Sequence, residues 1–142
     1  MMNRLFNPET SALILRLTLG TVLLAHSLYL KMVVFTLAGT AQFFVSIGLP
    51  ATLAYIVFLL EAIVGVGLLL GFYTRIFSAL IIPVLLGATW VHSASGWLFT
   101  NTGGGWEYPL VLSLMAIVQL GLGDGKYALS HYLLARQSLR NS

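Results

Sequence analysis

A single carboxylate, Glu61, stands near the middle of the most apolar stretch of the chain, residues 51–71. As a helix, this stretch (ATLAYIVFLLEAIVGVGLLLG) is long enough to cross the roughly 30 Å hydrocarbon core of a bilayer. A charged side chain at that depth costs about 2.5–3.5 kcal/mol on insertion scales. We therefore expect Glu61 to face other protein or a water-filled pocket, and to have a partner there.

Two histidines and a second glutamate are candidates to complete a site around Glu61. His26 and His92 lie near the ends of two other apolar stretches, and Glu107 begins a further one. A carboxylate and two imidazoles in a low-dielectric pocket can exchange protons near neutral pH. They can also hydrogen-bond the oxygens of a lipophilic ligand, a combination that suits the head group of a quinone. The predicted catalytic residues are Glu61, His92, His26 and Glu107, and the predicted ligand-binding residues are Lys31, Thr89 and Trp106.

Each of these residues also has a purely structural interpretation. A lone buried histidine is usually a satisfied core residue, Glu107 can complement a helix dipole, and Arg16 and Lys31 can snorkel to the interface. Two histidines can hold a haem or a metal, but no ligand-type spacing supports either, and no flavin motif is evident. The burial cost of Glu61, and the gathering of the other candidates on its side, favour a functional site.

Composition places the chain in a membrane. Its 142 residues are 58% hydrophobic and only 8% charged, whereas a soluble domain is about 25% charged. The chain has no cysteine, which excludes disulfides and thiolate-bound metals for the chain acting alone. The net charge of +3 comes from basic residues scattered over ends and loops, a pattern typical of positive-inside topology rather than of nucleic-acid binding.

The apolar runs predict an all-α polytopic membrane protein, a four-transmembrane-helix bundle in one domain over residues 1–142. The helices are expected at about residues 12–30, 51–71, 75–95 and 107–122. Lys31 ends or interrupts the first helix, and residues 32–48 form an interfacial or partly re-entrant segment with a short helix. A cleavable signal peptide ending near Ser27 is the alternative for the first helix, disfavoured because the apolar run continues. The tail, residues 126–142, is expected to form a surface helix.

The basic residues also predict an orientation. Four spans put both termini on one side of the bilayer, and a cytoplasmic side for them collects most of the positive charge. The residues then on the cytoplasmic side are Arg4, Arg75, Lys126, Arg136 and Arg140, with Lys31 outside. We predict a multi-pass protein of the bacterial inner membrane, with the 96–106 loop extracytoplasmic and the candidate site in the outer half.

Several motifs in order along the chain resemble one family. They are Arg-Leu-Thr-Leu-Gly (16–20), a histidine and a lysine near the end of the first helix, Gly-Leu-Pro (48–50), the mid-helix glutamate, Leu-Leu-Leu-Gly-Phe-Tyr-Thr-Arg (68–75), His92, Gly-Gly-Trp-Glu-Tyr (104–108) and Gly-Asp-Gly (123–125). In order and spacing, residues 16–130 resemble the DoxX family of small bacterial inner-membrane proteins. The chain departs from the family pattern at Ser27, where glycine is common, and at Lys31, which comes one residue late.

The resemblance implies a four-helix bundle and a link to redox chemistry, because related proteins are associated with thiosulfate:quinone oxidoreductase and with oxidative-stress membrane complexes. It supports Glu61, His92 and Glu107 as site residues, and His26 with them. The first hypothesis is a quinone-interacting redox subunit that receives electrons from a membrane or periplasmic redox partner or from its substrate. The alternatives are a non-enzymatic scaffold or assembly subunit, and a small-solute or proton-coupled transporter. A homo-oligomer is left open.

Overall fold

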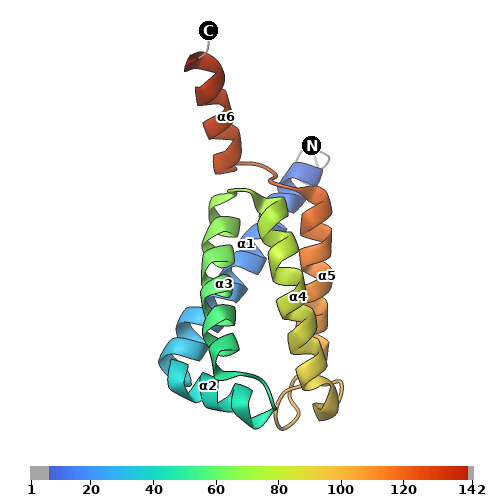
Figure 1. The fold of residues 1–142 in the computed structure, drawn as a ribbon. Helices are drawn as coiled ribbons and strands as arrows, with labels where there is room; N and C mark the ends of the chain where they lie inside the picture. Colours follow the sequence, from blue (N-terminus) through green and yellow to red (C-terminus); the bar gives the residue numbers. More distant parts are fainter. Residues whose placement is uncertain (1–6, 141–142) are drawn as a thin grey trace.

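The computed structural model describes residues 7–140, and Arg4, which contributed to the predicted orientation, lies outside them. Within these residues the chain is all-α, with six α-helices, one π-helix and one short 3-10 helix. The elements are α1 (Pro8–Leu24), η2 (Ala25–Val34), α2 (Leu37–Ser46), α3 (Ala51–Leu70), α4 (Thr74–His92), η3 (Ser93–Ser95), α5 (Glu107–Leu122) and α6 (Leu129–Arg140). In Figure 1, α1, α3, α4 and α5 run side by side. We call the end of this bundle that α2 crosses the α2 end, and the end from which α6 projects the α6 end.

The first helical segment runs further than its sequence predicts. It begins at Pro8, where the Asn7 side chain accepts a hydrogen bond from the backbone N–H of Thr10 at 2.9 Å and so caps the helix. Lys31 was expected to end or interrupt this helix; it does not end it, because the chain stays helical to Val34, but the α-helical winding is interrupted from Ala25 onward. Its last ten residues wind as a π-helix, a form that is rare beyond a single turn and frequent at functional sites. The short helix α2 then occupies the segment predicted to be interfacial.

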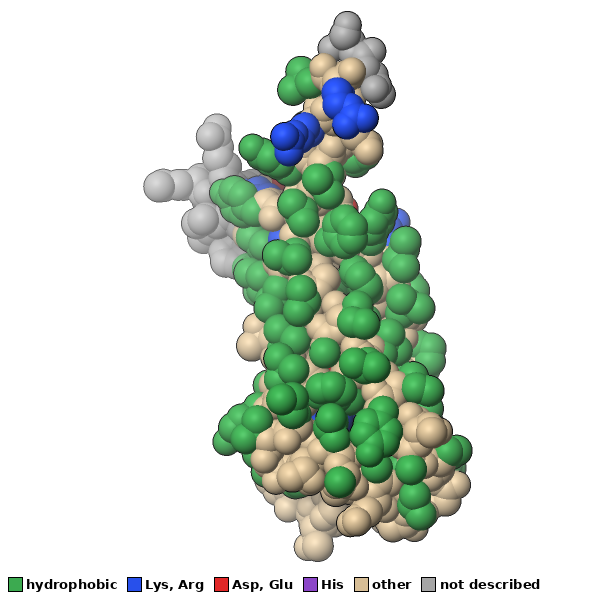
Figure 2. Space-filling view, turned by 60° about the vertical axis from the view of Figure 1, so that its left-hand side comes forward, with side chains coloured by type: hydrophobic (Ala, Val, Ile, Leu, Met, Phe, Trp, Pro, Cys, Tyr) green, Lys and Arg blue, Asp and Glu red, His purple; other side chains and the backbone are tan. Residues whose placement is uncertain are grey.

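Between residues 7 and 140, three helical segments are long and apolar enough to cross a bilayer, which indicates a multi-pass membrane protein. They are Pro8–Val34, Ala51–Leu70 and Thr74–Ser95. The segment Glu107–Leu122 is also apolar but shorter, at 16 residues, and it has the predicted bounds. The second span ends one residue earlier than expected, since Gly71 takes the left-handed C-cap position with φ +68°. Large apolar side chains cover much of the outer surface between the two ends (Figure 2).

Two glycines allow α1 and α3 to cross closely. A Cβ atom at Gly20 would lie 2.9 Å from the carbonyl oxygen of Gly65, and one at Gly65 would lie 2.8 Å from Cγ of Leu24. Small residues at such crossings let membrane helices pack backbone to backbone. The core beside this crossing consists of Leu19, Leu23, Val64, Leu68, Ile81, Leu85, Leu112 and Ala116. It therefore joins α1, α3, α4 and α5.

We expect Gly20→Ala to lower the free energy of unfolding by about 1–3 kcal/mol, because the added methyl group forces the two backbones apart. Gly87→Ala is the matched control, since Gly87 lies within α4 and a Cβ there meets nothing within 4 Å. Removing that helical glycine should be neutral or stabilising by about 0.5–1 kcal/mol. Thermal unfolding in detergent measures both, and equal effects of the two substitutions would contradict the close crossing.

Polar side chains close the α6 end. Arg16 is 1% exposed, and its Nη1 donates to the carbonyl oxygens of Leu68 and Leu69, both at 3.0 Å. Its Nη2 donates to the carbonyl oxygen of Lys126 at 2.9 Å. The snorkelling interpretation of Arg16 is therefore wrong. The last carbonyls of α3 lack partners within the helix and carry partial negative charge, so they attract the buried guanidinium.

The Gly-Asp-Gly segment and Ser130 complete this closure. Asp124 Oδ1 accepts from the backbone N–H of Thr74 at 3.0 Å, so Asp124 caps α4. The Ser130 hydroxyl donates to the Gly71 carbonyl at 3.0 Å and accepts from the Tyr73 N–H at 3.1 Å. The α3–α4 turn is thereby tied to the linker after α5 through Asp124, and to the first turn of α6 through Ser130.

Candidate functional site

The structure gives Glu61 a partner, Lys31. Glu61 lies on α3 and is 6% exposed. The Nζ atom of Lys31, on η2, donates to Oε2 of Glu61 in a short, charge-assisted ion pair. The side chain of Lys31 is itself only 17% exposed, so Lys31 points into the protein rather than snorkelling to the interface. A carboxylate and an ammonium group are therefore paired within two membrane-spanning segments.

The π-helical winding of η2 positions Lys31 for this pair. In an α-helix, side chains four residues apart lie on one face. Lys31 follows His26 by five residues. Because a π-helix pairs residue i with residue i+5, two residues five apart lie about one turn apart. The π-helix thus keeps Lys31 and His26 on the same side.

His26 lies close enough to Glu61 for the two groups to interact electrostatically. Its Nδ1 lies 2.9 Å from the Val22 carbonyl oxygen. A carbonyl can only accept, so Nδ1 donates in this bond, and Nε2 is available as an acceptor whenever the ring carries no second proton. The imidazole also stacks on the ring of Tyr108, with centroids 5.7 Å apart and planes 24° apart. Lys31, Glu61, His26 and Tyr108 form what we call the Glu61 cluster.

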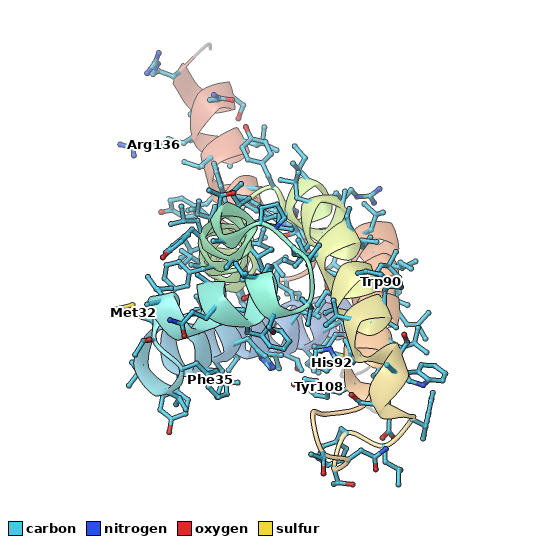
Figure 3. The ribbon with its side chains drawn as sticks, turned by 60° about the horizontal axis from the view of Figure 1, so that its bottom comes forward. Met32, Phe35, Trp90, His92, Tyr108 and Arg136 are labelled. Carbon is cyan, nitrogen blue, oxygen red and sulfur yellow. The ribbon has the colours of Figure 1, made fainter. Side chains whose placement is uncertain are left out.

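Tyr108 was not among the predicted site residues. The Gly-Gly-Trp-Glu-Tyr motif is the sequence signal that marks its position. Tyr108 lies in the first turn of α5, so the cluster draws on η2, α3 and α5. In the view of Figure 3, Tyr108 and His92 both project between α2 and the end of α4. Trp90 of α4, in contrast, is 67% exposed.

His92 and Thr89 bond to their own helix. His92 Nδ1 lies 2.8 Å from the Ala88 carbonyl oxygen, and the Thr89 hydroxyl donates to the Leu85 carbonyl at 2.8 Å. A Cβ at Gly104 would lie 3.1 Å from the His92 ring, so this imidazole borders the loop that follows η3. Within residues 7–140, His92 makes no hydrogen bond to Glu61. The structure therefore does not join either residue to the ion pair.

Glu107 and Trp106 organise the loop at the α2 end. Glu107 Oε2 accepts from the backbone N–H of Phe99 at 3.4 Å, and the Glu107 N–H donates to the Trp97 carbonyl at 3.1 Å. The indole rings of Trp97 and Trp106 meet edge to face, with centroids 4.4 Å apart. These contacts hold the loop against the start of α5, and they do not extend to Lys31 or Glu61.

A groove in the described part of the chain lies away from these residues. It is an apolar groove of about 410 Å³, lined by Ile63, Val66 and Leu70 of α3 and by Phe77 of α4, among others. By helical spacing these α3 side chains are on the opposite face from Glu61. Residues 7–140 contain no group of three or more His, Asp or Glu side chains placed to hold a metal ion.

Comparison with known proteins places these residues in a family. The sequence profile of the DoxX family matches residues 11–94. The chain belongs to the DoxX family. The DoxX match includes His26, Lys31, Glu61 and His92, and it ends before Tyr108 and Glu107.

A Bacillus subtilis (strain 168) protein named "Putative oxidoreductase CatD" is 39% identical over 87 residues, which are 61% of this chain and 61% of that protein. The matched part thus spans less than two thirds of the length of CatD. No solved structure matches the chain.

Proposed function

We propose that this DoxX family protein is a quinone-interacting redox subunit of the bacterial inner membrane, and that the Glu61 cluster receives the quinone head group. The ion pair between Lys31 and Glu61 carries this proposal. Ionisable side chains within membrane spans are expensive, and they mark proton and ligand pathways by default. The name of the relative, "Putative oxidoreductase CatD", supports the same class of chemistry.

The residues of the cluster suit the proton and hydrogen-bond requirements of a quinone. Reduction of a quinone to its quinol takes up two electrons and two protons. The Lys31 ammonium group can donate a hydrogen bond to a quinone carbonyl, and the free Nε2 of His26 can carry a proton to and from it. Glu61 holds Lys31 in place and can itself exchange a proton. The two electrons come from a redox partner in the membrane or periplasm, or from its substrate.

We further propose that α5 is a fourth span and that both termini are cytoplasmic. Sixteen residues of helix measure about 24 Å, so α5 crosses most of the hydrocarbon core, and Trp97 and Trp106 extend the span toward the interface. The α6 end carries Arg75, Lys126 and the arginines of α6, which favours a cytoplasmic location. A reporter inserted between residues 103 and 104 should behave as extracytoplasmic. A cytoplasmic signal would contradict this orientation and indicate the opposite one.

Quinone binding tests the functional proposal. We expect the purified protein to bind short-chain ubiquinone or menaquinone analogues, and Glu61→Gln to weaken that binding at least about tenfold, a loss of about 1.4 kcal/mol. Glu9→Gln is the matched control, because Glu9 is an exposed carboxylate in the first turn of α1, at the α6 end. Titration followed by tryptophan fluorescence measures both variants. No binding by the unaltered protein, or equal binding by Glu61→Gln, would contradict the proposal.

A scaffold role is the second candidate. It is favoured by the local bonding of His92, Thr89 and Glu107, which hydrogen-bond to their own helix or to the neighbouring loop. A scaffold would retain a stable partner after affinity purification. The Glu61→Gln variant would retain the same partner even if it binds no quinone. Recovery of the protein without any partner would count against this role.

A further inference from the structure

The segment that contains α6, residues 126–140, carries charges of one sign only. From residue 126 to residue 140 every charged side chain is basic, with Lys126, Arg136 and Arg140, and His131 can add a proton. None of the residues of α6 is buried. In Figure 2, the two blue arginine side chains of α6 stand beside green apolar ones at the end of the molecule. This segment therefore offers basic and apolar groups that the bundle does not cover.

Five of these side chains share one face of α6. Leu129, Tyr132, Leu133, Arg136 and Arg140 follow each other at helical spacing. All five are exposed, and Tyr132 is 75% exposed. A face of this composition suits a membrane surface, where leucine and tyrosine enter the acyl boundary. The long stems of the arginines then let the guanidinium groups reach phosphate oxygens.

The start of α6 is held near the level where the spans end. Only residues 123–128 separate α5 from α6. The Ser130 hydroxyl donates to the Gly71 carbonyl, which follows the last residue of α3. Lys126 donates its backbone N–H to the Glu9 carbonyl at 3.1 Å, near the start of α1. These bonds keep α6 within reach of the bilayer surface at the α6 end.

We propose that α6 docks on the anionic phospholipid headgroups of the leaflet at the α6 end, with the Leu129–Arg140 face toward the lipid. Charge complementarity selects this occupant, because the segment carries positive charge without any acid and bilayer phosphates carry the opposite charge. Docking requires α6 to lie along the surface rather than to project from it. The proposal does not depend on quinone binding at the other end of the bundle.

Site-directed spin labelling of the full-length protein tests the docking. The chain has no cysteine, so a single introduced cysteine is labelled uniquely. A label at Leu133→Cys lies on the proposed lipid face, and a label at Ser138→Cys lies on the opposite face of the same helix. In vesicles of phosphatidylglycerol we expect the label at position 133 to be protected from a water-soluble relaxation agent. In phosphatidylcholine vesicles it should be accessible, and the label at position 138 should be accessible in both.

Removing the charges should undo the docking. Arg136→Gln and Arg140→Gln should each weaken it about fivefold. Arg75→Gln, at the start of α4, removes one exposed positive charge from the same end of the molecule and should leave it unchanged. Because α6 has no buried residue, these variants should keep the bundle intact, which circular dichroism checks.

Three results would overturn the proposal. One is equal accessibility of the labels at positions 133 and 138 in phosphatidylglycerol. The second is equal protection at position 133 in both lipids, which would show apolar docking without charge recognition. The third is protection that arises only when a soluble acidic protein is added, which would assign the face to a protein partner.

Discussion

Replacing Lys31 with methionine is expected to lower the free energy of unfolding by about 3–5 kcal/mol, because it leaves the Glu61 carboxylate buried without its partner. Replacing Glu61 with methionine strands the Lys31 ammonium group and should have an effect of similar size. Thermal or denaturant unfolding in detergent, followed by the fluorescence of the tryptophans, measures both. Glu9→Gln, an exposed carboxylate at the α6 end, should change stability by less than about 0.5 kcal/mol.

The double variant Lys31→Met/Glu61→Met distinguishes a pair from two independent charges. A buried ion pair replaced by apolar residues of similar volume is often neutral for stability. We therefore expect the double variant to be more stable than either single variant, with a coupling free energy of at least about 2 kcal/mol. If the two single effects simply add, Lys31 and Glu61 do not act as a pair.

Replacing Arg16 with methionine is expected to destabilise the protein by at least about 3 kcal/mol. The substitution removes the donors to the Leu68, Leu69 and Lys126 carbonyls, and each hydrogen bond from a charged group contributes about 1.5–3 kcal/mol. The methionine also fills a site shaped for a guanidinium group at the junction of α1 and α3. The same unfolding measurement, together with protease sensitivity of the linker after α5, reports the loss.

Two further substitutions give the Arg16 prediction its controls. Arg75→Met removes an arginine that is exposed and should cost less than about 1 kcal/mol. Arg16→Lys keeps the charge but not the planar fork that reaches both α3 and the linker, so it should recover only part of the stability. A loss for Arg75→Met as large as that for Arg16→Met would show that charge at this end matters more than the bonds of Arg16.

The apolar helices could be predicted from sequence because length and hydropathy largely determine them. The segments 51–70 and 107–122 have nearly the predicted bounds, since glycines end the apolar run at one end or both. The continuation of the first helical segment past Lys31 could not be predicted in the same way. A π-helix has no distinctive residue pattern, and here the pairing of Lys31 with a residue thirty positions later accompanies that winding. Local propensity contains no information about such a long-range contact.

The candidate site was predicted in part. The cost of burying Glu61 correctly predicted that it has a partner. The sequence indicates how deep in the membrane a residue lies, but not the direction in which its side chain points. His92 and Thr89 shared the predicted depth, yet their polar atoms bond to their own helix. Arg16 was misassigned because its partners are backbone carbonyls, which every residue has and no sequence letter distinguishes. Whether His92, Glu107, Thr89 and Trp106 take part in function stays a prediction.

The measurement that tests the central claim most directly is quinone affinity in the double variant Lys31→Met/Glu61→Met. This variant is expected to stay folded, so a change in its affinity reports on the chemistry of the pair rather than on lost structure. The account predicts that it binds a short-chain quinone at least about tenfold more weakly than the unaltered protein. An unchanged affinity in the folded double variant would contradict the assignment of the Glu61 cluster as the quinone site.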